Sequence, residues 1–442
     1  MIDQPLLQID QILLPTTRDG TTGLPTTQAA QPLSLDFSVG QFHLLAGEDV
    51  APLAQVLRLI AGYDPLPQGR LQMRGQPLAG IPLGARGIAS VTSDPRLFPQ
   101  LTIGRNILFP LSGARRIGDT ATAVAGAALR VGLSAAALDR YPDEISLAMQ
   151  LRAALARALA LGPSLLLLTD PLRDLPAADA ASLLQDLRRL QRDLSLTVIC
   201  ASDRLPVWAP IADRITLLET AGGRLGGILQ SGTAEDIYLR PESRSAARLS
   251  GAVNLLPVEI LARSGDMLTC RSTVIDPMIL DLPQRQVAST LLRSLPVATA
   301  QDAASIEPIP AISDGTEMPE TRHVLGEASL LLRPSLLRPG LGIRRQDFRI
   351  EGRIQDRFSD GATVTLQVNV PGLPTPIVAT MPAPTPFPLE QGMAVSLGWN
   401  RGDMRLLPRD AKPGDLRPSD HRPGDARPGD ARSFATTGKD RA

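Results

Sequence analysis

The stretch that begins at Gly47 has the layout of a loop that binds phosphate, but not its chemistry. An apolar run ends at Ala46, and an apolar stripe at helical spacing follows. In the pattern G-x-x-x-x-G-K-[ST], backbone N–H groups and a lysine hold the phosphates. Counted from Gly47, the second glycine is Pro52, the lysine is Leu53 and the hydroxyl residue is Ala54. The frame of such a loop is present, and its phosphate ligands are not.

The charges around this stretch also oppose phosphate. Pro52 has no N–H to donate, and Glu48 and Asp49 place two carboxylates beside it. The chain has two lysines, Lys412 and Lys439, and both belong to its last residues. The sequence therefore predicts a loop that repels nucleotide. The alternative is an ordinary turn between strand and helix that never bound phosphate.

Apolar runs alternate with helical patterns on both sides of this loop. Short runs such as Leu165–Leu168 indicate strands that are buried on both faces, as in a parallel sheet. We expect an α/β fold with a mostly parallel sheet, and Leu33–Ala46 reads as a hairpin that leads into the central strand. The other expected elements are strands at Ile88–Thr92 and Thr197–Ala201, and helices at Ser146–Leu161 and Ala177–Leu194.

The order of these segments resembles a known family. From Leu33 to about Pro257 the chain is similar to the ATP-binding subunits of ABC importers, of the type that serves polyamines, iron, sulfate or sugars. The fragments VLRLIAG, LFPQLT, YPDEISLAMQLRAALARALALGPSLLLLTDPL and AEDIYLRP carry the likeness. It implies a P-loop NTPase-like nucleotide-binding domain with a parallel sheet, and ATP and magnesium as cofactors if the site keeps residual activity.

The same resemblance implies that the catalytic positions have changed. The paired acids of the family read Thr169 and Asp170, and no glycine stands near the signature serine, Ser146. Asp170 is either a shortened catalytic carboxylate or a solvent-facing acid that caps a helix. Phosphoryl transfer needs all of these groups together, so we expect no turnover, no intact catalytic residue and no metal ligand set. The remaining changed positions are Ser93 for the family's glutamine, Pro176 for the D-loop aspartate and Asp203 for the switch histidine.

One feature of the family survives in the middle of this region. Leu97, Phe98 and Pro99 match the residues that form a groove for the coupling helix of the membrane permease. An aromatic residue between prolines can equally belong to the local core. The resemblance thus leaves a docking surface as one of two interpretations.

The composition changes after Gly251. Two β-rich segments alternate in the manner of paired strands, one of them around a turn at Asp360–Gly361, and resemble the OB-like TOBE domain of the same importers. The predicted domains are 1–245 (ABC-type), 250–408 (all-β, TOBE-like, with a flexible insertion at about 295–322) and 409–442 (a disordered tail of Arg-Pro-Gly-Asp repeats).

Composition excludes some classes of function. The formal net charge is zero, which gives no general attraction to nucleic acid. No apolar run reaches the roughly 20 residues that span a bilayer. Any membrane association must then come through a partner. The resemblance implies a cytoplasmic protein that reaches the inner face of the membrane through permease subunits.

Three hypotheses follow. The first is a degenerate ABC importer subunit that docks on permease subunits without hydrolysing ATP, paired with itself or with an intact ABC ATPase. The second is a divergent but active ATPase that relies on Asp170 and Ser146. The third is a soluble regulatory or scaffold module whose C-terminal barrel binds a small ligand.

Overall fold

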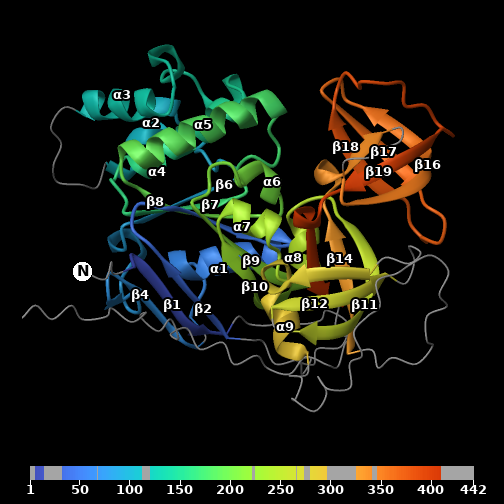
Figure 1. Ribbon diagram of the computed structural model, residues 1–442. Coiled ribbons are helices and arrows are strands. Elements are labelled where there is room, and N and C mark those ends of the chain that lie inside the picture. Colours follow the sequence, from blue (N-terminus) through green and yellow to red (C-terminus); the bar gives the residue numbers. More distant parts are fainter. Residues whose placement is uncertain are drawn as a thin grey trace, which may run out of the picture. The chain divides into compact units, whose positions relative to one another are not determined.

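Six strands form the central sheet of the N-terminal part in this computed structural model (Figure 1). Neighbouring strands from β9 to β6 run parallel, and β10 pairs antiparallel with β9. The α/β fold with a mostly parallel sheet is therefore confirmed. The order across the sheet is β10 (Arg224–Gly232), β9 (Arg214–Ala221), β3 (Phe42–Ala46), β8 (Thr197–Ser202), β7 (Leu165–Thr169) and β6 (Ile88–Thr92).

The structure describes nine stretches of the chain. The expected insertion at about 295–322 lies outside them except for Leu295, and the expected tail lies outside them except for Arg409. Among the described residues, no helix is long and apolar enough to cross a bilayer. The described stretches are residues 5–13, 32–66, 68–111, 120–221, 224–264, 266–272, 279–295, 325–340 and 346–409.

Helices cover both faces of the central sheet (Figure 1). Leu165 and Leu167 of β7 face a core with α1 (Val50–Ala61), whereas Leu166 and Leu168 face a larger core on the other side. This alternation explains why β7 is apolar throughout. The helices of the larger core include α2 (Ile103–Leu108), α3 (Thr120–Arg130), α4 (Leu147–Leu159), α5 (Ala177–Asp193) and α6 (Leu205–Trp208).

A small antiparallel sheet corrects the expected hairpin at Leu33–Ala46. β2 and β3 do not pair with each other, because β2 pairs with β1 and β3 lies between β8 and β9. All five residues of β3 are buried, so β3 fits the centre of the parallel sheet. The small sheet has the order β2 (Leu33–Phe37), β1 (Leu7–Ile12), β4 (Arg70–Met73) and β5 (Gln76–Pro77).

Two five-stranded antiparallel sheets form the C-terminal part, as expected for an all-β domain. Their shared core includes the fully buried Trp399 and Leu397. The Asp360–Gly361 turn is confirmed, because it joins two paired strands of the second sheet. The first sheet is β13 (Ile279–Pro283), β12 (Met267–Ser272), β11 (Asn254–Ser264), β14 (Gly326–Leu332) and β20 (Met404–Pro408); the second is β15 (Arg338–Gly340), β19 (Ala394–Trp399), β16 (Phe348–Ser359), β17 (Thr363–Asn369) and β18 (Ile377–Pro382).

Three more short α-helices pack against the parallel sheet or the first C-terminal sheet. Ala247 of α8 belongs to the core of the C-terminal sheets, and Ala246 of the same helix belongs to the core under the parallel sheet. Residues Met1–Arg409 form one compact unit. The short helices are α7 (Ala234–Leu239), α8 (Arg244–Leu249) and α9 (Ser289–Ser294).

Candidate functional site

The turn between β3 and α1 is only three residues long, Gly47 to Asp49. It lies at the carboxyl end of the central parallel strand, where open α/β sheets bind their ligands. Gly47 is required there by close packing, since a Cβ atom would lie 2.8 Å from the side chain of Thr220. The Asp49 N–H donates to the Thr220 hydroxyl at 2.9 Å, so this donor is already used. The turn is tight and anchored to β9.

Asp49 caps the first turn of α1. Its backbone is extended, with φ −128° and ψ 130°, and its carboxylate accepts a hydrogen bond from the Ala51 N–H at 2.9 Å. Free N–H groups give a helix N-terminus a partial positive charge that attracts anions. In this chain a carboxylate of the protein itself lies at that position.

Pro52, Leu53 and Ala54 are part of the helix rather than of the loop before it. Pro52 stands in the first turn, where a missing N–H removes no intrahelical hydrogen bond. Leu53 is completely buried in the core under α1, and Ala54 is half-buried. The position at which the pattern has its lysine is thus a core position. The sequence shows that the lysine is missing, but not that its place is filled by packing.

Asp170 lies directly after β7 and is buried, with 2% of its surface exposed. The prediction of a solvent-facing acid is therefore wrong. Its Oδ1 accepts hydrogen bonds from the Ser202 hydroxyl at 2.9 Å and from Arg204 at 3.3 Å. Its Oδ2 lies 2.9 Å from an Nη of Arg173. Asp170 has a positive φ of 38°, which is uncommon for a residue other than glycine, while its N–H donates to the Ala201 carbonyl.

Arg173 joins Asp170 to Asp203. Its guanidinium donates to both carboxylate oxygens of Asp203, at 2.9 and 3.0 Å. The hydrogen bond to Asp203 is the main reason that the pKa of Arg173 is raised. We call Asp170, Arg173, Asp203 and Arg204 the acid–arginine cluster. It gathers at the carboxyl ends of β7 and β8, and its two carboxylates bind guanidinium groups of the chain itself.

Arg173 and Arg204 were missed by the sequence reasoning. Arg173 stands three residues after Asp170, so its spacing was a usable signal, but Arg204 follows a different strand, β8. Thr169, the other half of the acid pair, accepts a backbone hydrogen bond from the Ser93 N–H at 3.2 Å. The structure thus brings Ser93, Thr169, Asp170 and Asp203 together at one edge of the sheet.

Ser146 is the N-cap of α4. Its hydroxyl accepts a hydrogen bond from the Met149 N–H at 3.4 Å, which is the role of serine at this position. The expected helix at Ser146–Leu161 is confirmed with slightly narrower bounds, Leu147–Leu159.

The loop after β6 is held by a buried asparagine. Asn106, on α2, is fully buried, and its amide oxygen accepts a hydrogen bond from the Phe98 N–H at 2.8 Å. Its amide nitrogen donates to the carbonyls of Phe98, Leu101 and Thr102 at 3.0 to 3.1 Å. This side chain fixes the backbone that carries Leu97, Phe98 and Pro99.

Phe98 of this loop forms an aromatic pair with Phe109, which directly follows α2. The rings of Phe98 and Phe109 lie 4.5 Å apart between centroids, and Phe109 is 52% exposed. Arg157 lies over the Phe98 ring at 5.8 Å and donates to the carbonyls of Pro95 and Arg96, both at 2.9 Å. Phe98 is half-buried, Leu97 packs against the helical core and Pro99 is exposed. We call Phe98, Pro99 and Phe109 the aromatic loop surface.

Clusters that could hold a metal were sought in the part of the chain that the structure describes. No group of three or more His, Cys, Asp or Glu side chains with that geometry occurs there. His43 of β3 is buried, and its Nε2 accepts a hydrogen bond from the Ser38 N–H at 3.2 Å. Burial is the main cause that lowers the pKa of His43 to about 4.

The fold and this site define an ABC-type ATP-binding domain followed by an all-β domain. The ABC transporter family matches residues 30–173, and the TOBE domain matches residues 330–407. The chain is 30% identical over 249 residues to the spermidine/putrescine import ATP-binding protein of Ruegeria pomeroyi, covering 56% of this chain and 67% of that one. It is 32% identical over 265 residues to a sulfate/thiosulfate import ATP-binding protein of Chromobacterium violaceum, covering 60% and 70%.

A third relative is named for a different transported substrate. The Fe(3+) ions import ATP-binding protein of Mesorhizobium japonicum is 34% identical over 232 residues, which cover 52% of this chain and 62% of that protein. The chain therefore belongs to the family of ABC importer ATP-binding subunits with a C-terminal TOBE domain.

Proposed function

We propose that this chain is an ABC importer subunit that docks on permease subunits without hydrolysing ATP. The observation that carries the proposal is the Asp49 carboxylate at the N-terminus of α1, 2.9 Å from the Ala51 N–H. In a phosphate-binding loop, the N–H groups at this end of the helix bind the phosphates. A phosphate brought there would meet the charge of Asp49 and of the neighbouring, exposed Glu48.

The residues of the site do not fit a magnesium–ATP complex. The side chain at the lysine position, Leu53, is buried in the core and offers neither charge nor access. Thr169 stands where the family has the first of its two acids, so one carboxylate of the pair is missing. Losing the lysine removes one positive charge from the phosphates, and losing the acid removes a ligand of the magnesium ion that would supply another.

The acid–arginine cluster supports the same proposal. Asp170 would need a carboxylate oxygen that a water molecule can reach, but the residue is buried. Its Oδ1 accepts hydrogen bonds from Ser202 and Arg204, and its Oδ2, which makes no hydrogen bond to the described residues, lies 2.9 Å from Arg173. The pairing of Arg173 with Asp203 adds a second carboxylate that is already neutralised. In this proposal the cluster holds the ends of β7 and β8 in one arrangement, whether or not nucleotide is present.

The aromatic loop surface supports docking. The exposed ring of Phe109, packed against Phe98 on a loop that the buried Asn106 fixes, suits the apolar side of a short amphipathic helix. Phe109 supplies exposed apolar surface for a partner. Asn106 and Arg157 hold Phe98, which contacts the ring of Phe109. We infer a cytoplasmic location at the inner face of the membrane from this docking, with a second copy or an intact ABC ATPase as the dimer partner. The proposed division into domains remains 1–245, 250–408 and 409–442.

Affinity purification tests the docking half of the proposal. The tagged full chain is produced in its native host, and the co-purified membrane proteins are identified with and without added ATP. We expect ABC permease subunits in both samples, and less of them with Phe109→Ala. Leu129→Ala on α3 is the matched control, because Leu129 is 76% exposed and lies outside the aromatic loop surface. Absence of permease subunits, or equal loss with Leu129→Ala, would refute the docking surface.

A further inference from the structure

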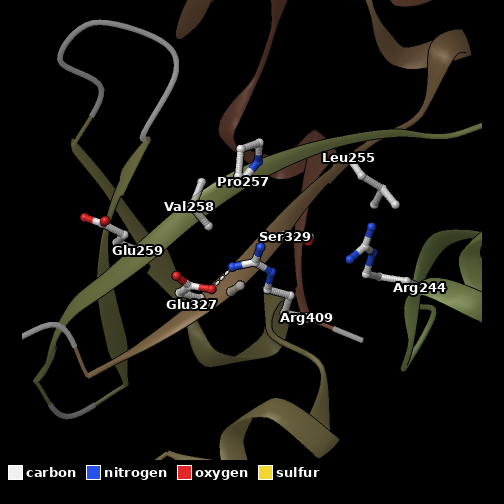
Figure 2. A pocket seen from close by; sticks show the side chains of 9 residues that line it. Arg244, Leu255, Pro257, Val258, Glu259, Glu327, Ser329 and Arg409 are labelled. Carbon is white, nitrogen blue, oxygen red and sulfur yellow. Dashed lines mark ion pairs between the residues drawn. The ribbon is translucent and has the colours of Figure 1, made fainter. Parts of the chain in front are cut away.

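Residues 238–252 connect the central sheet to the first C-terminal sheet, and we call them the joint. They include the end of α7 and all of α8, and both helices pack on β10 of the central sheet. α8 also lies beside the first C-terminal sheet, because Arg244 lines the same cavity as Leu255 of β11 and Ser329 of β14 (Figure 2). The contacts of the joint therefore decide whether the two sheets can move independently.

Arg333 reaches the joint from the end of β14, and only 2% of its surface is exposed. Its guanidinium donates hydrogen bonds to the Tyr238 carbonyl at 2.7 and 3.1 Å, to the Ala247 carbonyl at 3.0 Å and to the Ser250 hydroxyl at 2.7 Å. It also lies 4.2 Å from the centroid of the Tyr238 ring. One side chain thus binds the last turn of α7 and the C-terminal end of α8.

The partners of Arg333 are neutral groups. Among the described residues Arg333 forms no ion pair, and it donates to carbonyl and hydroxyl oxygens. The free carbonyl groups at the C-terminal end of a helix attract cations, and two such ends meet this guanidinium. By contrast, Arg409 pairs with Glu327 on the same sheet, where both side chains are more than half exposed (Figure 2). Water can replace the partner of Arg409, whereas a small rotation at the joint would break several bonds of Arg333 where water has no access.

Arg405 holds the joint at a second point. It stands on β20 opposite Leu331 of β14, and 7% of its surface is exposed. Its guanidinium donates to the Pro241 carbonyl at 2.8 Å and to the Glu242 carboxylate at 2.7 Å. The Glu242 N–H in turn donates to the side-chain oxygen of Gln230 on β10 at 3.0 Å. A line of hydrogen bonds therefore runs from β20 through the joint to the central sheet.

We propose that Arg333 and Arg405 lock the joint, so that the central sheet and the first C-terminal sheet move and unfold as one body. The two arginines come from neighbouring strands and bind different parts of the joint, and two points of attachment prevent rotation about either one. A partner that binds one of the two sheets then acts on the other as well. The proposal does not depend on the state of the nucleotide site.

Pulse-labelling hydrogen exchange along a urea series, read by mass spectrometry, follows β9 and β11 in the same full-length molecules. In the wild type we expect both strands to lose protection at the same urea concentration, because one cooperative body has one transition. Arg333→Met keeps an apolar stem but removes the donors, and should separate the two midpoints by about 0.5 M urea or more. Arg409→Met is the matched control and should leave them together, because Arg409 directly follows β20 and lies outside the joint. Separate midpoints in the wild type would overturn the proposal.

A second variant covers the case in which Arg333→Met does not fold. Glu242→Gln keeps the size of the side chain but removes the charge that pairs with Arg405, and we expect a smaller separation of the midpoints. If Arg333→Met lowers both midpoints equally, Arg333 stabilises the chain without coupling its sheets, and the proposal fails. Coincident midpoints in Glu242→Gln would remove Arg405 from the lock.

Discussion

Two regions of the N-terminal part treat their polar groups in opposite ways. At the edge formed by the carboxyl ends of β3, β7 and β8, the charged groups of Asp49, Asp170 and Asp203 are held by other groups of the chain. In the aromatic loop surface, Asn106 fixes the backbone of Phe98, and the ring of Phe109 at the end of α2 stays exposed. The comparison teaches that the polar groups of the first region are occupied by the chain itself, while the second region leaves an aromatic side chain exposed to solvent.

The largest expected effect comes from restoring the lysine of the phosphate pattern. Leu53→Lys would place an ammonium group in the core, since Leu53 is fully buried. We expect a loss of about 3 kcal/mol or more in the free energy of unfolding. Ala54→Ser, at the next and half-buried position, is the control and should change it by less than about 1 kcal/mol. A stable Leu53→Lys variant that binds ATP would show that the edge is not closed.

The buried histidine of β3 makes stability depend on pH. His43 has its pKa lowered to about 4 from an ordinary 6.5, so the unfolded chain binds this proton more readily than the folded one. Stability should be full above pH 6.5 and fall by about 3 kcal/mol as the pH drops toward 4. Urea unfolding at pH 7 and pH 5 measures the loss. His43→Gln should flatten the curve in this window, and an unchanged slope in that variant would contradict the assignment.

Removing one acid of the acid–arginine cluster should cost less. Asp170→Asn leaves Arg173 and Arg204 without a buried carboxylate, and we expect a loss of about 1 to 3 kcal/mol because both arginines are partly exposed. Asp94→Asn in the loop after β6 is the control. Asp94 and Arg96 are both more than 70% exposed, so that pair should contribute below about 0.5 kcal/mol. Equal losses in chemical denaturation would remove the contrast between the two regions.

The helix cap should have a smaller effect that separates charge from hydrogen bonding. Asp49→Ala removes the acceptor of the Ala51 N–H, and we expect a loss of about 1 kcal/mol. Asp49→Asn keeps an acceptor and should stay close to wild type. Thermal unfolding of both variants distinguishes them. If Asp49→Ala is as stable as wild type, the cap does not hold the turn as described.

The smallest effect on stability is expected at the exposed aromatic ring. Phe109→Ala should change the free energy of unfolding by about 0.5 kcal/mol or less, because half of the side chain already contacts solvent. A loss above about 2 kcal/mol would mean that Phe109 is a core residue rather than part of a docking surface.

Much of the fold could be predicted from the sequence because apolar runs and helical stripes mark it locally. Leu165–Leu168 reads as a strand from its own residues, and the structure confirms it. The hairpin at Leu33–Ala46 was wrong because pairing depends on distant strands, which place β3 beside β8. The functional site was harder to predict because it, too, depends on residues that are distant in the sequence. Asp170 is buried by contacts to Ser202 and Arg204, more than thirty residues away, which its own neighbourhood does not reveal.

Equilibrium binding of ATP is the most direct measurement of the closed edge. The purified full chain is titrated with fluorescent ATP at millimolar magnesium, beside an intact ABC importer subunit as a positive control. The account predicts no saturable binding to this chain up to millimolar nucleotide, and none gained with Asp49→Asn, in which the charge of the cap is removed. Saturable, magnesium-dependent binding at micromolar ATP would contradict it.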